Sequence, residues 1–538
     1  MTATECARTV VSALLQLDVE HVVLCPGSRS APLAFAFEQA AREGRVQLHV
    51  RIDERSAGFL ALGLAKASGR VVPIVTTSGT AVGNLLPAVM EASHSGVPIM
   101  VLSADRPATM LHTGANQTTD QTRLFERFTR AEAQISGGEG TPKAWSFQVS
   151  RLVTAALGLR TRDPGPVQLN VAFTEPLVPA GDDWPEVSPT RVASPTPAPT
   201  RIRVPSQGTI VLVGDCPPAV GDRAAKLAMW SEVPILSEPS GNARFGPAVR
   251  TYRLLLDTEL GAEITRVLLF GHPTLSRPVS RLLAREDVEV IAVTGGARWI
   301  DPGTNVAGVV DEVEIIPDGS GWDTRWIMAG LDLGDRLDAE LGDELSGPTI
   351  AAAMWQSLTS DDTLVIGSSN PIRDLDLAPV SDTAPRAYAN RGLAGIDGTL
   401  ATAQGIALIH GPTTVLLGDL TFLHDVGSLL IGPLERTPDL RVIVVNDDGG
   451  SIFHVLEQGA DEYAESFERI FGTPTGVEIE GLARAYGWRY REVSDLSALR
   501  TLVAQPVTGR EIVEIRVSRQ DRRAQGARLS RLGSPEGG

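Results

Sequence analysis

Two acidic turns could together hold a divalent cation. The first, Gly418-Asp419, ends an apolar run that begins at Thr414, and the second, Asn446-Asp447-Asp448-Gly449-Gly450, ends the run RVIVV. Carboxylate and carbonyl oxygens are the ligands of hard cations such as Mg²⁺, and glycines allow the backbone to approach a bound phosphate closely. Asp and Gly are also common loop residues, so either turn alone favours an ordinary turn. Their pairing favours a site.

The apolar runs before these turns predict two neighbouring buried strands. Continuous Val, Ile and Leu residues bounded by turn residues fit parallel strands that are covered on both faces, and the segment between the two runs is long enough for a crossover with a short helix. Both turns would then lie at carboxyl ends of strands, the edge at which open α/β sheets bind ligands. The sequence therefore predicts a cation and phosphate site at this edge.

A glutamate stands at a third predicted strand end. Glu54 lies in VRIDERSAGFLALGLAKASG, where a strand gives way to a helix. An acidic residue in the first turn of a helix complements the helix dipole, and the local pattern alone favours that structural interpretation over a catalytic one.

Length and composition exclude several classes of protein. The 538 residues exceed one ordinary core, so about three domains are expected. A net charge of -17 without a basic run argues against a nucleic-acid partner. The three cysteines, Cys6, Cys25 and Cys216, exclude a disulfide framework and a Cys-rich metal site. With neither a signal-like N-terminus nor an apolar run of membrane-spanning length, we expect a cytoplasmic protein without a membrane span.

Alternating strand and helix patterns predict three successive doubly wound α/β domains with mainly parallel sheets. Residues 1–180 form the first, with strands in HVVLCPGS, QLHVRIDE, VVPIVTTSG and PIMVLSADRP and helices in SAGFLALGLAKAS and TAVGNLLPAVMEAS. Residues 181–208 are rich in Pro, Ser and Thr and predict an extended linker. Residues 209–345 form a central domain and 346–538 the third. No G-x-G-x-x-G follows a strand and no Walker A motif occurs, so NAD and ATP are not supported.

Together, the turns and the three α/β units resemble the decarboxylase-like thiamine-diphosphate enzymes. Their diphosphate-anchoring motif begins with GDG or GDx and ends in NN or ND-x-G. The resemblance implies a pyrimidine-binding, a central and a diphosphate-binding domain, with thiamine diphosphate and Mg²⁺ (or Mn²⁺) as cofactors. Asp419, Asp447 and the carbonyl of Gly449 would hold the metal. Asp447 replaces the family's commoner Asn and adds negative charge, which bears on metal preference.

The resemblance also gives Glu54 a chemical role. In the family, a glutamate at this strand-to-helix junction bonds N1′ of the cofactor's aminopyrimidine. Its proton promotes the tautomer that removes the thiazolium C2 proton, so the electron sink belongs to the cofactor and the protein contributes orientation and electrostatics.

Further motifs narrow the resemblance to the carboligases of menaquinone biosynthesis within that family. These motifs are PGSRSAPL from Pro26, SADRP from Ser103, GANQT from Gly114, ANRGLAGIDG from Ala389 and GGSIF from Gly449. The resemblance implies decarboxylation of 2-oxoglutarate and 1,4-addition of the resulting succinyl carbanion to isochorismate. It also implies a homodimer or homotetramer.

The remaining site residues follow from the same resemblance. Catalytic roles fall to Glu54, Gln117, Ser369, Arg373 and Arg391, substrate binding to Ser28, Arg29, Arg106 and Phe453, and cofactor binding to Glu54, Ser78, Gly79, Gly418 and Ile452. Arginine forks match carboxylates, and this reaction joins two polycarboxylates, although a solvated surface charge is the usual fate of any single arginine. Arg277 and Arg298 could form a regulatory anion site, but surface ion pairs are favoured.

Two other functions compete with this hypothesis. A related enzyme with the same cofactor, such as an acetohydroxyacid synthase or a 2-oxoacid decarboxylase, would leave the arginines unpaired around a small apolar substrate. A non-catalytic ligand sensor would not need Glu54, Asp419 and Asp447, all of which are present. We therefore expect a thiamine-diphosphate-dependent carboligase.

Overall fold

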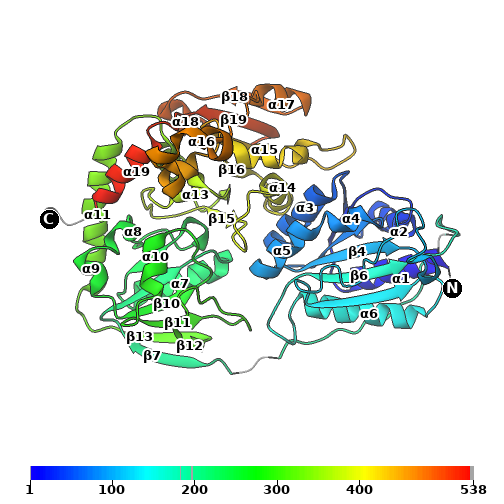
Figure 1. Ribbon diagram of the computed structural model, residues 1–538. Coiled ribbons are helices and arrows are strands. Elements are labelled where there is room, and N and C mark those ends of the chain that lie inside the picture. The colour runs from blue at the N-terminus through cyan, green and yellow to red at the C-terminus, as the bar shows by residue number, and fades with distance from the viewer. Residues whose placement is uncertain (1, 182, 196–197, 534–538) are drawn as a thin grey trace. The chain divides into compact units, whose positions relative to one another are not determined.

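The computed structural model describes residues 2–181, 183–195 and 198–533 and divides into two compact units (Figure 1). Unit 1 comprises Met1–Pro197, Asp397–Gly411 and Asp425–Pro438. Unit 2 comprises Ala198–Ile396, Pro412–His424 and Asp439–Gly538. Two segments of the range 346–538 therefore group with the N-terminal part of the chain.

Unit 1 is built on a six-stranded parallel sheet. Its strands, in the order β2-β1-β3-β4-β6-β5, are β1 His21–Leu24, β2 Gln47–Val50, β3 Val72–Thr76, β4 Ile99–Asp105, β5 Ala131–Ser136 and β6 Val167–Ala172. Every residue of β1, β3, β4 and β6 is buried, as expected for parallel strands covered on both faces.

Helices cover both faces of this sheet (Figure 1). One face packs against α1 Ala3–Gln16, α2 Ala31–Arg42 and α6 Pro142–Ala156. The other packs against α3 Glu54–Ser68, α5 Leu86–Ser95 and α14 Thr399–His410. The short helices α4 Thr80–Gly83, η1 Ala108–Met110 and η3 Val426–Leu429 complete the unit.

The segment TAVGNLLPAVMEAS, expected to be one helix, is broken. It forms α4 and α5, separated at Asn84 and Leu85. Pro87 explains the break, because it has no backbone N–H and its ring would clash with the carbonyl of Gly83 in a continuous helix.

Helices α3 and α14 cross with their backbones almost in contact. A Cβ on Gly63 would lie 2.1 Å from the carbonyl oxygen of Thr402, and one on Gly405 would lie 2.4 Å from that of Leu60. Ten of the fifteen residues of α3 and ten of the twelve of α14 are buried, so this pair forms part of the core of unit 1.

Unit 2 contains two larger parallel sheets. The central sheet has the order β12-β11-β10-β8-β9 and consists of β8 Thr209–Val213, β9 Ile235–Ser237, β10 Arg266–Phe270, β11 Glu289–Val293 and β12 Val306–Val310. Beside it, β7 Arg201–Pro205 pairs in parallel with β13 Glu312–Ile316. The last part of the predicted linker is therefore a strand, whose RIRVP sequence is half exposed and lacks the apolar run of a buried strand.

The third sheet follows the strand order of unit 1. It has the order β15-β14-β16-β17-β19-β18, with β14 Thr363–Ile366, β15 Arg386–Ala389, β16 Thr413–Gly418, β17 Leu440–Asn446, β18 Arg489–Glu492 and β19 Arg510–Arg516. When the strands of each sheet are counted along the chain, both six-stranded sheets have the order 2-1-3-4-6-5. The two strands predicted before the acidic turns are β16 and β17, which are parallel neighbours.

Helices and short turns fill the rest of unit 2. They are α7 Pro218–Trp230, η2 Pro239–Gly241, α8 Tyr252–Leu255, α9 Glu259–Ala262, α10 Arg277–Leu283, α11 Trp322–Leu341, α12 Gly347–Ser357, α13 Asn370–Leu375, α15 Asp419–His424, η4 Ser451–Val455, η5 Glu457–Gly459, η6 Asp461–Tyr463, α16 Ala464–Phe467, η7 Glu468–Gly472, α17 Ile479–Ala485, α18 Leu496–Val503 and α19 Arg522–Arg531. The predicted α/β class with mainly parallel sheets is confirmed. Within the described ranges, no helix is long and apolar enough to span a membrane.

Candidate functional site

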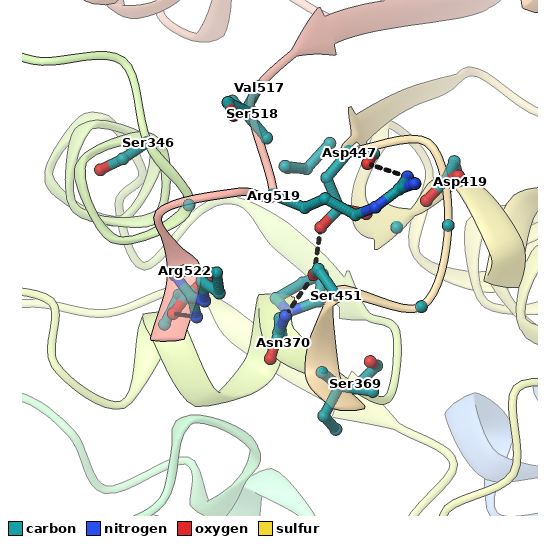
Figure 2. A pocket seen from close by; sticks show the side chains of 18 of the residues that line it. Ser346, Ser369, Asn370, Asp419, Asp447, Ser451, Val517, Ser518, Arg519 and Arg522 are labelled. Carbon is teal, nitrogen blue, oxygen red and sulfur yellow. Dashed lines mark hydrogen bonds and ion pairs between the residues drawn. The ribbon is translucent and has the colours of Figure 1, made fainter. Parts of the chain in front are cut away.

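A cavity of about 290 Å³ lies at the carboxyl ends of β14, β16 and β17 in unit 2 (Figure 2). The strand ends contribute most of its wall, and Arg519 and Arg522 contribute positive charge. The predicted site residues that line it are Ser369, Gly418, Asp419, Asp447, Gly449, Ile452 and Phe453. The structure thus brings together all the predicted metal ligands and part of the predicted catalytic, substrate and cofactor sets.

The two predicted metal-binding carboxylates are held in an environment that disfavours their charge. Asp419 is only 3% exposed, and burial, followed by the charge of Asp447, raises its pKa to about 7. Burial also raises the pKa of Asp447 to about 6, against a hydrogen bond from Ser451. A divalent cation between two such carboxylates would remove the cost of ionising them.

A short chain of hydrogen bonds orients Asp447 (Figure 2). The Ser451 hydroxyl donates to Asp447 Oδ2, and Asn370 Nδ2 donates to Ser451 Oγ over 2.6 Å. Asn370 Oδ1 is buried and has no hydrogen-bond partner in the described part of the chain. Sequence reasoning missed Asn370 and Ser451 as site residues, although Ser451 lies in the GGSIF motif and Asn370 directly follows Ser369.

The turn after β17 requires glycine at its tightest point. Gly449 has a φ of +136°, and a Cβ there would lie 1.9 Å from the carbonyl oxygen of Gly472. The next residue, Gly450, donates its N–H to that same carbonyl over 2.7 Å. The turn is therefore fixed against the end of η7, with its backbone bordering the cavity.

The donor set of this cavity suits a cation that is shared with a phosphate group. Across residues 2–181, 183–195 and 198–533, no group of three or more His, Cys, Asp and Glu side chains could hold a metal ion by itself. Two carboxylates and a backbone carbonyl leave coordination positions open, and Mg²⁺ commonly fills such positions with phosphate oxygens and water. The residues present fit a metal-bound diphosphate.

Of the two predicted substrate arginines of unit 2, one lines a neighbouring cavity. Arg373 lines a neighbouring cavity of about 460 Å³, which shares Asn370 and Arg522 with the first. Its Nη1 donates to the carbonyl of Leu275 over 2.8 Å, and its pKa is lowered by burial, then by Arg253 and Arg391.

Arg391 is more enclosed than Arg373. It is 4% exposed and lines neither of these two cavities. Its Nε and Nη2 donate to Thr274 Oγ1 over 2.9 and 2.5 Å, and its Nη1 donates to Ser368 Oγ over 3.3 Å. The guanidinium is thus fixed by residues that follow β10 and β14.

In unit 1, Glu54 begins helix α3 as predicted. Asp53 caps the helix by accepting the N–H groups of Arg55 and Ser56 over 2.9 and 3.3 Å. Glu54 is half-buried, and its carboxylate has no hydrogen-bond partner among the described residues. Because a neighbouring residue caps the helix, the Glu54 carboxylate is left available to a ligand.

Four further predicted residues meet at the ends of β3 and β4. Arg106 Nη1 donates to the hydroxyl of Ser78 and, over 2.8 Å, to the carbonyl of Gln117. Gln117 Nε2 donates to the carbonyl of Ser78 over 3.0 Å, and Gly79 donates its N–H to Gln121 Oε1 over 3.1 Å. Gln121 is buried and was missed, since no local pattern distinguishes it from other loop glutamines.

The remaining two predicted residues of unit 1 follow β1. Arg29 Nη1 donates to the carbonyl of Phe173 over 3.0 Å, and its pKa is lowered by burial and by Arg106. Ser28 is exposed beside it. Because the positive charge of Arg106 disfavours that of Arg29, an anionic ligand beside Arg29 would be stabilising.

Arg277 and Arg298, the two arginines considered for a regulatory site, both lie in unit 2. Arg277 forms an ion pair with Glu457 over 2.8 Å, with both side chains 69% exposed. Arg298 is exposed as well.

Comparisons with known proteins agree on one family. Residues 4–124 match the family model described as thiamine pyrophosphate enzyme, N-terminal TPP binding domain. The chain is 49% identical to the 2-succinyl-5-enolpyruvyl-6-hydroxy-3-cyclohexene-1-carboxylate synthase of Kineococcus radiotolerans, over 97% of this chain and 96% of that protein. Proteins of the same name from Arthrobacter sp. (strain FB24) and Nocardioides sp. are 47% and 46% identical, over 96% and 98% of this chain and 90% and 98% of theirs.

Proposed function

Since this chain belongs to the family of 2-succinyl-5-enolpyruvyl-6-hydroxy-3-cyclohexene-1-carboxylate synthases, we propose that it makes that compound as a thiamine-diphosphate-dependent transferase of menaquinone biosynthesis. The substrates are 2-oxoglutarate, which loses CO₂, and isochorismate, which accepts the succinyl unit by 1,4-addition. The observation that carries this proposal is the 49% identity, over nearly the whole chain, to a protein of that name.

Asp419, Asp447 and the Gly449 carbonyl would hold Mg²⁺ or Mn²⁺ against the diphosphate. Support comes from the shared cavity and from the raised pKa values of both carboxylates. When bound, thiamine diphosphate supplies the electron sink that stabilises negative charge on the reacting carbon. Ser78, Gly79, Gly418 and Ile452 would contact the cofactor, and Glu54 would hold a proton at its aminopyrimidine N1′.

The arginines would bind the carboxylates of the two substrates. Arg373 and Arg391, with Ser369, would orient the keto acid, whereas Arg29 and Arg106, with Ser28, would act mainly on isochorismate. Gln117 would position the reacting groups, and Phe453 would pack against substrate. Support comes from the lowered pKa values of Arg29 and Arg373, which burial and neighbouring arginines cause and which a bound anion would oppose.

An assay with both substrates tests the reaction itself. The purified protein, supplied with thiamine diphosphate, Mg²⁺, 2-oxoglutarate and isochorismate, is expected to consume isochorismate and release CO₂ in equal amounts. Replacing 2-oxoglutarate with pyruvate is expected to abolish most turnover, because a methyl group leaves the arginines unpaired. Equal use of pyruvate would favour the acetohydroxyacid-type alternative instead.

A cytoplasmic homodimer or homotetramer completes the proposal, and its support is the family resemblance alone. Light scattering at the assay concentration is expected to give at least twice the mass of one chain. A fully active monomer would contradict this part of the proposal without affecting the reaction.

A further inference from the structure

A completely buried glutamate lies at the carboxyl end of β9 in unit 2 and lines neither cavity. Glu238 directly follows β9 and is 0% exposed. Its Oε1 accepts the backbone N–H groups of Thr274 and Leu275 over 2.8 and 2.9 Å. Its Oε2 is buried and has no hydrogen-bond partner among the described residues. Burying a carboxyl group is costly. A glutamate at this position therefore indicates a role that an apolar residue could not fill.

The two residues that Glu238 holds also accept hydrogen bonds from Arg373 and Arg391. Thr274 Oγ1 accepts from two nitrogens of Arg391, over 2.9 and 2.5 Å, and the carbonyl of Leu275 accepts from Arg373 over 2.8 Å. The segment after β10 therefore has its N–H groups fixed on one side by Glu238, while its oxygens fix both guanidinium groups on the other.

A second contact from the same stretch fixes the strand that leads to Arg391. Strand β15 is an edge strand. On its outer side, Asn242 makes the hydrogen bonds that a neighbouring strand would make. Asn242 Oδ1 accepts the N–H of Ala387 over 2.8 Å, and its Nδ2 donates to the carbonyl of Ala387 over 3.0 Å. The loop after β9 thus acts on Arg391 in two ways. Asn242 contacts the strand that leads to Arg391, and Glu238 holds Thr274, which accepts hydrogen bonds from the guanidinium.

Electrostatics agree with this geometry. The charges of Glu238 and Arg391 interact, as do those of Glu238 and Arg373, while Asp376 opposes ionisation of Glu238. Burial raises the pKa of Glu238 to about 8, so a neutral carboxyl that accepts through one oxygen is compatible with its surroundings.

We propose that Glu238 is a positioning residue, which orients Arg373 and Arg391 for the carboxylate of the keto-acid substrate by holding Thr274 and Leu275. This inference rests on the proposed roles of Arg373 and Arg391. Glu238 itself contacts neither cavity, so it acts through the segment after β10.

The test compares E238A with E238Q in the full-length holoenzyme. E238A leaves two backbone N–H groups without an acceptor, so the KM for 2-oxoglutarate is expected to rise about tenfold or more, while the KM for isochorismate changes less than about twofold. E238Q keeps an oxygen at the Oε1 position and is expected to stay within about threefold of wild type for both substrates. Equal damage in the two variants would overturn the proposal.

A matched control separates positioning from general destabilisation. Glu511 in β19 is also buried, at 5% exposure, and pairs with Arg441 over 3.0 Å, away from the residues that line both cavities. E511A is expected to lower the unfolding midpoint without changing either KM. If E511A and E238A gave the same KM pattern, Glu238 would be only a structural residue.

A second variant keeps the proposal testable if E238A does not fold. T274V removes the hydroxyl that accepts from Arg391 but keeps the backbone N–H that Glu238 holds. It is expected to raise the KM for 2-oxoglutarate about fivefold or more, again with little effect on isochorismate. A wild-type KM in T274V would overturn the proposal.

A structural readout distinguishes failure of this inference from failure of the proposed function. If the wild-type protein does not use 2-oxoglutarate, the proposed function fails, yet the crystal structures of wild type and E238A still test positioning. Displacement of Thr274 and of the Arg391 guanidinium in E238A supports the inference. An unchanged segment after β10 would refute it.

Discussion

The two six-stranded sheets share one strand order, yet residues of different charge follow the third and fourth strands of each sheet. In unit 1, Ser78 and Arg106 follow the third and fourth strands, β3 and β4, and in unit 2, Asp419 and Asp447 follow the equivalent strands, β16 and β17. The same topology thus places a serine and an arginine after these two strands in one unit and two carboxylates after them in the other. Topology decides where functional residues can stand, and the residue types decide what they bind.

The two edges also differ in how far their polar groups satisfy one another. Arg106, Ser78 and Gln117 hydrogen bond among themselves, so this part of unit 1 is complete without a ligand. Burial and the charge of Asp447 instead raise the pKa of Asp419, and a bound cation would balance the two carboxylates. The unit 1 edge is therefore preorganised, whereas the unit 2 edge depends on its ligand.

The largest expected effect concerns Glu54, a carboxylate at the same edge of unit 1 as Arg106. It follows the second strand, where unit 2 has Arg391. Glu54→Gln fills the same space but cannot share a proton, so turnover is expected to fall roughly 10²- to 10⁴-fold with cofactor affinity nearly kept. Exchange of the cofactor's C2 proton measures the effect. Wild-type exchange in the variant would reduce Glu54 to a helix-terminal charge.

Removal of one carboxylate tests the dependence of the unit 2 edge on a cation. Asp419→Ala is expected to weaken thiamine diphosphate binding by about 100-fold or more, because the diphosphate would lose the metal that neutralises it. Calorimetry with Mg²⁺ and with excess chelator measures this. The control is Asp448→Ala, which changes an exposed residue of the second acidic turn that is not a predicted metal ligand. Equal affinity in wild type with and without metal would contradict the comparison.

The arginines of the two units are expected to serve different substrates. Arg391→Ala or Arg373→Ala is expected to lower kcat/KM by roughly ten- to a hundredfold through 2-oxoglutarate, because a charge-assisted hydrogen bond is worth about 1.5–3 kcal/mol. Arg29→Ala and Arg106→Ala are expected to raise mainly the KM for isochorismate. Steady-state kinetics with each substrate varied in turn would show whether this division holds. Unchanged KM values in all four variants would disprove the polycarboxylate assignment.

The smallest expected effect is on the pH dependence of stability. The folded-state pKa of Asp419 is raised from 3.8 to about 7, so the folded protein holds this proton more tightly than the unfolded chain. Stability from this group is complete below pH 4 and is lost as pH rises towards 7.

Asp419→Asn carries no charge and should remove this loss. In urea unfolding of the metal-free protein, the variant is expected to be about 1–2 kcal/mol more stable than wild type at pH 8 and equal to it at pH 4. Asp448→Asn, in the exposed turn, provides the control. If the free energy of unfolding had the same pH dependence in wild type and Asp419→Asn, folding would not disfavour the charged form of Asp419.

The sequence alone predicted those structural features that depend on residues adjacent in the chain. Continuous apolar runs predicted β16 and β17, and the turn residues after them predicted a shared edge, because both depend only on adjacent residues. Strand β7 was missed because its alternating RIRVP resembles a polar linker until β13, more than a hundred residues later, provides its partner. The break before α5 was also missed, because the helical spacing of the apolar residues around Pro87 predicted one continuous helix.

Functional neighbours that are distant in sequence could not be predicted. Arg391 was expected from a motif, but its partner Thr274 lies 117 positions earlier, in the loop after β10. Glu238 has no motif at all, since a buried glutamate and an exposed one have the same local sequence signature. Both become visible only when the fold places the loops after β9 and β10 against the end of β15.

The backbone contact between α3 and α14 sets how fast the first of these helices can open. With Gly63 and Gly405 leaving no room for side chains at the crossing, water reaches the amides of α3 only when the core of unit 1 opens as a whole. In hydrogen exchange followed by mass spectrometry, α3 should therefore be among the last segments to take up deuterium. Glu54 would sit on an element with almost no motion of its own on the timescale of turnover.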